Sequence, residues 1–441
     1  MGGILMHKHT VQPSQPSTKS FKALNVFLVL SAISAVSIFI LNILSHGSIL
    51  NDMYYGSDYF MDFFNSLCDA STKDVYSERG VIYPPLASIL FYLFSKMVPP
   101  EYAAFDFESG KRHRFYSQGS SQLLFLIFVI VFVILLAILL YSILQRKLTN
   151  IQAIAVSFFL VFSFPTIYCI QRGNITLIAL VLSLFFVFFR KSENKVIKEL
   201  SFIALAIAAG LKIFPALFGL LLLTDKKYKE AIRLAVYGII AFFLPFAFYG
   251  GFAGLTDLLN NIFRFSGMST QSYSVQGTSI SNLLAWFIFL FGIDLGTLIK
   301  IAKIVILLCC FFIFAFSDKE WVKLLTICFA LANIDSTARI YILIFLIIPF
   351  VSFLLSKKSD TINIFYSILF CMLLISIPCY WYFQIDTISE MLNAFVSLDE
   401  TTLVLFKKAN IVISSFVIFI FECSLFISTF KTLITSRRKS I

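Results

Sequence analysis

The sequence predicts an all-α polytopic membrane protein, a bundle of about 11 to 13 transmembrane helices. Its mean hydropathy of +0.90 and its 53 phenylalanines are too apolar for a water-soluble core. Runs such as Gln122–Leu144 stay apolar for long enough to cross a bilayer as a helix. Since these runs do not alternate as the strands of a membrane barrel would, helices are the structure that satisfies their backbone polar groups in lipid.

Basic residues give this bundle an orientation. The net charge is +11, and clusters of lysine and arginine fall in short breaks between apolar runs. These clusters are Gln145–Lys147, Arg190–Lys198, Asp225–Arg233, Lys357–Lys358 and Ser436–Ile441. Because cytoplasmic loops carry an excess of Lys and Arg, we expect all five inside the cell, and we expect no nucleic-acid partner.

The chain then divides into one membrane domain and two tails. Residues 1–22 and 431–441 are expected to be cytoplasmic basic tails, and residues 23–430 a single transmembrane domain. External loops are expected at about 45–82, 250–280 and 384–408. The first span lacks the pattern of a cleaved signal peptide, so it predicts a retained helix. We expect a multi-pass protein of a bacterial plasma membrane with both termini in the cytoplasm.

Four short segments interrupt the apolar pattern. "QRGN" (Gln171–Asn174) is expected at the external tip of a helical hairpin, and "KIFP" (Lys212–Pro215) between two short helices. Tyr83–Val98 and Ser281–Ile293 disturb the inside–outside alternation if they are counted as full spans. We expect both to form short helices that line a cavity, with the tandem proline of "YPPLA" starting the first.

Two aspartates follow the first span in a chain with only 13% charged residues. Asp58 and Asp62 are four residues apart and would share one face of a helix. Their aromatic neighbours would partly desolvate a carboxylate that serves as a general base, although capping an interfacial helix is an alternative role. The pair can also hold a divalent cation, but no metal or other cofactor is expected to be required, and no His or Cys spacing predicts a metal site.

Four cations lie at ends or breaks of apolar segments on the same predicted external side. They are Arg172, Lys212, Arg264 and Arg339. A charge at membrane depth is costly unless it is paired, so these residues predict a site for a phosphate or pyrophosphate group. Snorkelling to lipid headgroups is the alternative for each, and Asp335 is a potential partner for Arg339. Glu422, in the last span, is expected to be structural.

These motifs resemble, in order, those of the GT-C glycosyltransferases, and most closely glycosyltransferase family 87. The matching elements are Asp58 after the first span, "YPPLA" (Tyr83–Ala87), "RGN", "GLKIFP" and "TSISNLLAWF" (Thr278–Phe287). The resemblance implies an inverting membrane enzyme that takes a sugar from a polyprenyl-phosphate donor. The sugar would pass to a hydroxyl of a lipid-linked or polymeric glycan acceptor at the external face.

The resemblance also suggests residue roles. The family's catalytic aspartate matches Asp58, with Asp62 as the alternative, and its basic residue before the proline matches Lys212. Where many members carry a late histidine, this chain has Arg339, which favours a different donor or acceptor. Lys212, Arg172, Arg264 and Arg339 would bind the donor phosphate, and Tyr83, Asn174, Tyr273 and Asn282 would bind sugar or acceptor. A phosphate leaving group needs no protonation, so one base suffices.

Two other functions fit a polytopic chain with external basic residues. A polysaccharide polymerase or ligase usually concentrates its functional residues in one large external loop, whereas the candidates here are spread over four segments. A transporter of lipid-linked glycans should carry polar residues along the midplane of several helices, where Glu422 is the main candidate. Both remain alternatives at this level.

Overall fold

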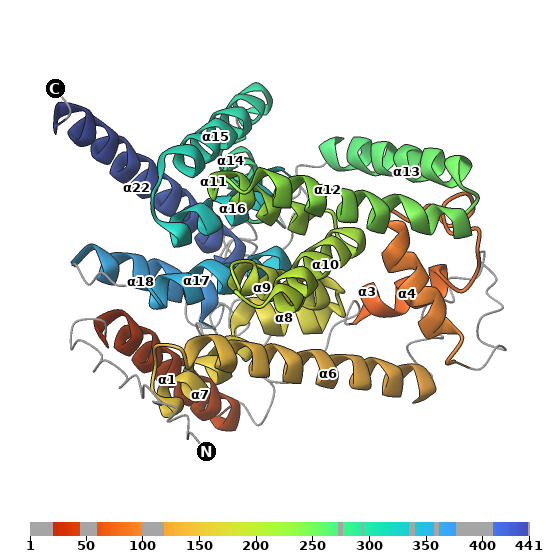
Figure 1. The fold of residues 1–441 in the computed structure, drawn as a ribbon, viewed down its shortest axis with the longest axis horizontal. Coiled ribbons are helices and arrows are strands. Elements are labelled where there is room, and N and C mark those ends of the chain that lie inside the picture. The colour runs from red at the N-terminus through yellow and green to blue at the C-terminus, as the bar shows by residue number, and fades with distance from the viewer. Residues whose placement is uncertain are drawn as a thin grey trace, which may run out of the picture.

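The structure is a computed structural model that describes residues 21–44, 60–98, 119–271, 277–292, 295–334, 340–356, 361–375 and 409–439. Every regular element in these ranges is a helix, which confirms the predicted all-α membrane fold. Figure 1 shows α3 (Met61–Asp69) and α4 (Pro85–Ser95) at one end of the molecule, beside α12 (Tyr228–Phe243) and α13 (Phe252–Gln271). The C-terminal part of α22 (Ala409–Lys439) lies at the opposite end.

Within the described residues, five helices are long and apolar enough to cross a membrane. They are α1 (Phe21–Leu44), α6 (Gly119–Leu144), α12 with its 3-10 extension η4 (Leu244–Phe248), α15 (Gly296–Phe316) and α22. The pair α7 (Asn150–Val161) and α8 (Phe164–Arg172), bent by 44°, makes a sixth if it is one span. The protein is therefore multi-pass, and the total of about 11 to 13 spans remains a prediction.

The remaining helices are shorter. They are α9 (Thr176–Phe189), α10 (Lys195–Leu211), η3 (Phe214–Gly219), α11 (Leu220–Thr224), α14 (Ile280–Phe291), α16 (Glu320–Ile334), η5 (Ile340–Leu346), α17 (Ile347–Leu354) and α18 (Thr361–Leu374). The helices α4 and α14 have 11 and 12 residues. At 1.5 Å per residue each is only about 16–18 Å long, too short for a bilayer core of about 30 Å. Both predicted short helices are thus confirmed, and Pro84 and Pro85 do open α4.

The break at "KIFP" also forms as predicted. Helix α10 ends at Leu211, and Lys212 has an extended backbone (φ −144°, ψ 126°) before Pro215 enters η3. The chain then runs back through α11 to Asp225, whose carboxylate lies 3.3 Å from Nε of Arg190 at the other end of α10. Lys212 therefore lies about 25 Å along α10 from the basic loop that precedes the helix.

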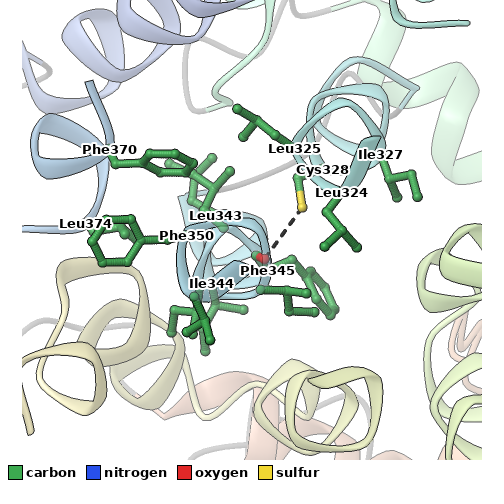
Figure 2. Close-up of a cluster of buried hydrophobic side chains, with 14 of the residues drawn as sticks. Leu324, Leu325, Ile327, Cys328, Leu343, Ile344, Phe345, Phe350, Phe370 and Leu374 are labelled. Carbon is green, nitrogen blue, oxygen red and sulfur yellow. Dashed lines mark hydrogen bonds between the residues drawn. The ribbon is translucent and has the colours of Figure 1, made fainter. Parts of the chain in front are cut away.

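A dense apolar core surrounds η5 and α17. Figure 2 shows Leu343, Ile344, Phe345 and Phe350 of this segment packed between α16 and α18. The Cys328 thiol lies 3.5 Å from the Phe345 carbonyl, to which it donates. All four side chains are almost fully buried. Because interiors are close-packed, this core fixes the start of η5, including Tyr341, which belongs to the candidate site.

Charged side chains join three loops at the end of α10 opposite Lys212. Arg190, only 2% exposed, contacts Asp225 and also lies 3.1 Å from Glu320. Lys191 contacts the same two carboxylates at 2.8 and 3.4 Å. The network brings together the loops after α9, α11 and α15, so these loops lie on one side of the bundle.

Replacing Arg190 with methionine should destabilise the fold by about 1–3 kcal/mol, because the substitution removes charged hydrogen bonds from a buried site. The matched control is Arg233→Met, which breaks a pair with Glu199 on a side chain 41% exposed and should cost about 0–1 kcal/mol. Thermal unfolding of the two purified variants measures the difference. Equal melting temperatures would contradict the structural role of Arg190.

Candidate functional site

Asp62 lies in the first turn of α3, at the end of the molecule that carries α4 and α13. The helix begins at Met61, and Phe60 before it has a left-handed backbone (φ 59°). Residue 60 is therefore not part of α3. The pairing of Asp58 with Asp62 on one helix face stays a prediction, because Asp58 lies outside the described residues.

The Asp62 carboxylate is held by both polar residues of the "RGN" turn. Arg172 donates from Nη2 to Oδ1 at 2.6 Å, and Asn174 donates from Nδ2 to Oδ2 at 2.7 Å. The side chains of Arg172 and Asp62 are 12% and 18% exposed. Charge-assisted bonds of this length are the stronger kind, and partial burial reduces their screening by water. The orientation of the carboxylate is therefore fixed.

Gly173 explains why a glycine separates these two residues. It ends α8 with a left-handed backbone (φ 67°). A Cβ at this position would lie 2.8 Å from the Phe60 carbonyl oxygen and 2.9 Å from Cβ of Phe63. The Phe60 amide in turn donates to the Gln171 carbonyl at 2.7 Å. Only glycine permits both the turn and this close approach of α3.

The amide of Asn174 is oriented by its neighbours. Its Oδ1 accepts from the backbone amide and the hydroxyl of Thr176, at 3.0 and 2.6 Å. Because Oδ1 is occupied by donors, Nδ2 is the atom that faces Asp62. Asn174 is 2% exposed, so these bonds satisfy a buried polar group.

Lys212 lies against the ring of Tyr83. Its ammonium is 4.2 Å from the centroid of the Tyr83 ring and 5.8 Å from that of the Tyr341 ring. Contact with aromatic faces stabilises a cation at a partly desolvated position. Tyr341 was not predicted from the sequence, because only the packing of η5 brings it to Lys212.

Tyr83 connects the two charged groups. Burial raises the pKa of its phenol well above the usual value, and the negative charge of Asp62 raises it further. The phenol therefore stays protonated and can donate a hydrogen bond. The Tyr76 hydroxyl donates to the backbone carbonyl of Tyr83 at 3.0 Å and also lies 3.2 Å from the hydroxyl of Ser88, which fixes the loop before α4.

A cavity of about 310 Å³ opens beside Asp62 and Tyr83. Its walls come from α3, the loop between α3 and α4, α4 itself and α13. The lining residues are Asp62, Asn65, Ser66, Asp69, Ala70, Arg79, Gly80, Val81, Ile82, Tyr83, Ser88, Phe91 and Phe265. Asn65, Asp69 and Arg79 were not predicted from the sequence. The one available signal was the position of Arg79 just before "YPPLA".

Two further predicted residues lie elsewhere. Asn282 is 2% exposed and belongs to the N-terminus of α14, where its amide oxygen contacts the Ser279 hydroxyl and its backbone amide donates to that hydroxyl at 3.3 Å. Arg264 is exposed on α13, next to Phe265 of the cavity wall. Tyr273 and Arg339 lie outside the described residues.

Glu422 accepts a 2.9 Å hydrogen bond from Nδ2 of Asn333, whose Oδ1 accepts from the Ile280 amide at 3.1 Å. The pair supports the start of α14, in agreement with the structural role expected for Glu422. Among the described residues, no group of three His, Cys, Asp or Glu side chains is arranged to hold a metal ion.

The comparison with protein families gives one match. The model of glycosyltransferase family 87 matches residues 82–337, more than half of the chain. The matched range includes Tyr83, the "RGN" turn and Lys212, and it begins after Asp62. No curated protein matches the chain, and no solved structure matches it.

Substituting Gly173 with alanine should destabilise the protein, because the new Cβ meets a backbone carbonyl that cannot move away cheaply. The control is Gly292→Ala, at a glycine with φ 65° and open space around its Cβ, which should cost only about 1 kcal/mol of backbone strain. Thermal unfolding should show a clearly larger loss for Gly173→Ala. A loss no larger than that of the control would contradict the tight fit.

Tyr83 should make folding stability fall at alkaline pH. Unfolded tyrosine loses its proton near pH 10, whereas the folded phenol keeps it above that value, so the folded state binds more protons there. Stability should be unaffected by Tyr83 below about pH 9 and decrease above pH 10. Unfolding free energies measured from pH 8 to 11 should show a smaller decrease for Tyr83→Phe, and an unchanged decrease would contradict this.

Proposed function

Because the chain belongs to glycosyltransferase family 87, we propose that it transfers a hexose or pentose from a polyprenyl-phosphate sugar to a lipid-linked or polymeric glycan acceptor. The reaction takes place at the external membrane face, inverts the anomeric carbon and uses an aspartate as general base. The donor, the acceptor and this mechanism are the parts that go beyond membership of the family.

One observation carries the proposal: a carboxylate and an ammonium both lie close to one half-buried tyrosine, Tyr83. Asp62 is fixed beside the cavity, and Lys212 lies against the Tyr83 ring. Transfer from a sugar phosphate needs a base near the attacking hydroxyl and a cation near the departing phosphate. These two needs match the two charged groups.

In this mechanism Asp62 takes the proton from the acceptor hydroxyl as its oxygen attacks C1. Each carboxylate oxygen already accepts one hydrogen bond and has a second lone pair for the incoming hydroxyl. The bond between C1 and the phosphate oxygen breaks, and its electron pair leaves with the lipid phosphate. Lys212 stabilises the charge that grows on that oxygen.

The geometry changes the role proposed for Arg172. Its guanidinium is paired with Asp62, so its first contribution is to orient the base together with Asn174. Lys212 is then the main ligand of the donor phosphate, and Tyr83 donates a hydrogen bond to the sugar. Asp58, which the sequence favoured as the base, stays a candidate because it lies outside the described residues. Arg264 and Arg339 remain candidate phosphate ligands, and Tyr273 and Asn282 remain candidate sugar ligands. No cofactor is proposed.

The orientation rests on the two ends of the bundle. The Arg190 network lies about 25 Å along α10 from Lys212, and the C-terminal part of α22 lies at the opposite end of the molecule from α3 and α4. By the positive-inside rule these basic ends would face the cytoplasm, which supports a site that faces outward in a plasma membrane. A cytoplasmic location of both termini is part of this proposal.

A polysaccharide polymerase or ligase and a glycan transporter are the alternatives. Nothing in the described residues favours a transport path. Glu422 accepts a hydrogen bond from Asn333 of α16, and Asn333 in turn binds the first residue of α14. The family match favours glycosyl transfer.

Asp62→Asn should reduce sugar transfer by about 10²–10⁴-fold, because it removes the base while keeping the shape of the side chain. The assay uses purified protein with radiolabelled polyprenyl-phosphate hexoses and pentoses and a panel of octyl glycoside acceptors. Asp74→Asn, an exposed aspartate in the loop after α3, is the matched control and should leave the rate unchanged. If Asp58→Asn abolishes transfer while Asp62→Asn does not, the base is Asp58.

Lys212→Met should lower transfer by about 10²–10³-fold through loss of phosphate stabilisation, and Lys212→Arg should recover part of the rate. Steady-state rates at varied donor concentration separate the effect on kcat from that on KM. Wild-type kinetics in Lys212→Met would remove Lys212 from the mechanism.

A further inference from the structure

The cavity beside Asp62 and the Lys212 ammonium both adjoin Tyr83. Asp62 and Tyr83 line the cavity, whereas Lys212 lies over the Tyr83 ring and is not among the lining residues. In an in-line displacement the nucleophile lies on one side of the reacting carbon and the leaving group on the other, so the two substrates of the proposed reaction occupy different places. The chemistry of the cavity lining indicates which of the two it takes.

The charge of the cavity argues against a phosphate inside it. Its charged lining groups are Asp62, Asp69 and Arg79, and Arg172 is paired with Asp62, so the formal charges at the cavity sum to zero. The cavity therefore offers a lipid phosphate no net positive charge. Lys212 presents a cation beside two aromatic rings, so the phosphate is favoured beside it.

The polar groups of the cavity suit hydroxyls. Carboxylates accept, the guanidinium of Arg79 donates, and the Asn65 amide and Ser88 hydroxyl can do both. Oδ1 of Asn65 is shielded from solvent, and no hydrogen-bond partner is found for it within the described part of the chain. A buried acceptor without a partner is costly, so a bound hydroxyl that donates to it would be stabilised.

Aromatic side chains flank this polar surface. Phe91 is buried in α4, and Phe265 on α13 is 42% exposed. Helix α13 is held to the loop before α4 by Asn261, whose Nδ2 donates to the Tyr76 carbonyl at 2.8 Å. The position of Phe265 is therefore fixed, and its ring can cover the apolar face of a flat ligand.

From these features we propose that the cavity is the acceptor subsite and binds the terminal sugar ring of an uncharged carbohydrate. A volume of about 310 Å³ is at the lower end for ligand pockets, which suits one or two sugar rings and not a lipid chain. The attacking hydroxyl lies at Asp62, and the ring packs on Phe265. This inference rests on the proposed transferase activity, which supplies the donor.

The assignment keeps the chemistry balanced. The acceptor hydroxyl loses its proton to Asp62 and forms the new bond to C1, while the bond from C1 to the phosphate oxygen breaks. The electron pair leaves with the lipid phosphate on the Lys212 side, and Asp62 later releases the proton to water. No oxidant, reductant or further reactant is needed.

The test compares Phe265→Ala and Asn65→Ala with Phe263→Ala, a matched control whose side chain is 72% exposed on the same helix and outside the lining. Four quantities are measured for each: direct binding of radiolabelled octyl glycosides to the purified protein, KM for octyl glycoside, KM for polyprenyl-phosphate sugar, and the rate of donor hydrolysis without acceptor. Phe265→Ala should weaken glycoside binding and raise the glycoside KM about 3–10-fold, with the donor KM and donor hydrolysis unchanged. Asn65→Ala should act in the same direction, and the control should match the wild type.

The outcomes separate the two proposals. If the donor KM rises in place of the glycoside KM, the cavity takes the donor and the acceptor assignment is wrong. If no octyl glycoside binds to the wild type, or binding is equal in all variants, the acceptor assignment is also wrong. If glycosides bind in a Phe265-dependent way but no lipid-phosphate sugar is consumed, the subsite stands and the proposed transferase reaction fails.

Discussion

The bonds from Arg172 and Asn174 to Asp62 join two segments that are 110 or more residues apart in the chain. They fix α3 against the end of α8, and Gly173 makes the contact close enough for both to form. With α3 in place, the loop that follows it brings Tyr83 and Arg79 to the same region. The site therefore depends on these two hydrogen bonds to Asp62. The left-handed backbone of Gly173 and the fixed orientation of the Asn174 amide allow them to form.

A second constraint is the end of helix α10, which determines the position of Lys212. Lys212 can occupy its position because α10 stops at Leu211 and the extended backbone that follows, with Pro215, prevents the helix from continuing. Packing of the core around η5 places the ring of Tyr341 5.8 Å from the ammonium. A cation at membrane depth is costly when it is isolated, and two aromatic faces reduce that cost. The ammonium and the Asp62 carboxylate thus both lie near Tyr83.

Local sequence signals predicted the breaks well because proline and glycine act on their own neighbourhood. "YPPLA", "RGN" and "KIFP" each ended or began a helix where expected. The membrane class followed from hydropathy alone. Contacts between distant segments were not predictable in the same way. No local signal indicated that Asn174 and Arg172 bind Asp62, or that Tyr341 lies near Lys212, because packing of separate helices decides both. The helical pairing of Asp58 with Asp62 stays a prediction, because Asp58 lies outside the described residues.

The central claim is that Asp62 and Lys212 belong to one transfer site, in which Asp62 is the base and Lys212 binds the donor phosphate. The most direct measurement is a structure of the protein with polyprenyl phosphate, the product lipid, bound in a membrane mimetic. The phosphate is expected within hydrogen-bond distance of Nζ of Lys212 and outside the cavity. A phosphate found inside the cavity, bonded to Arg79 and Asn65, would contradict it.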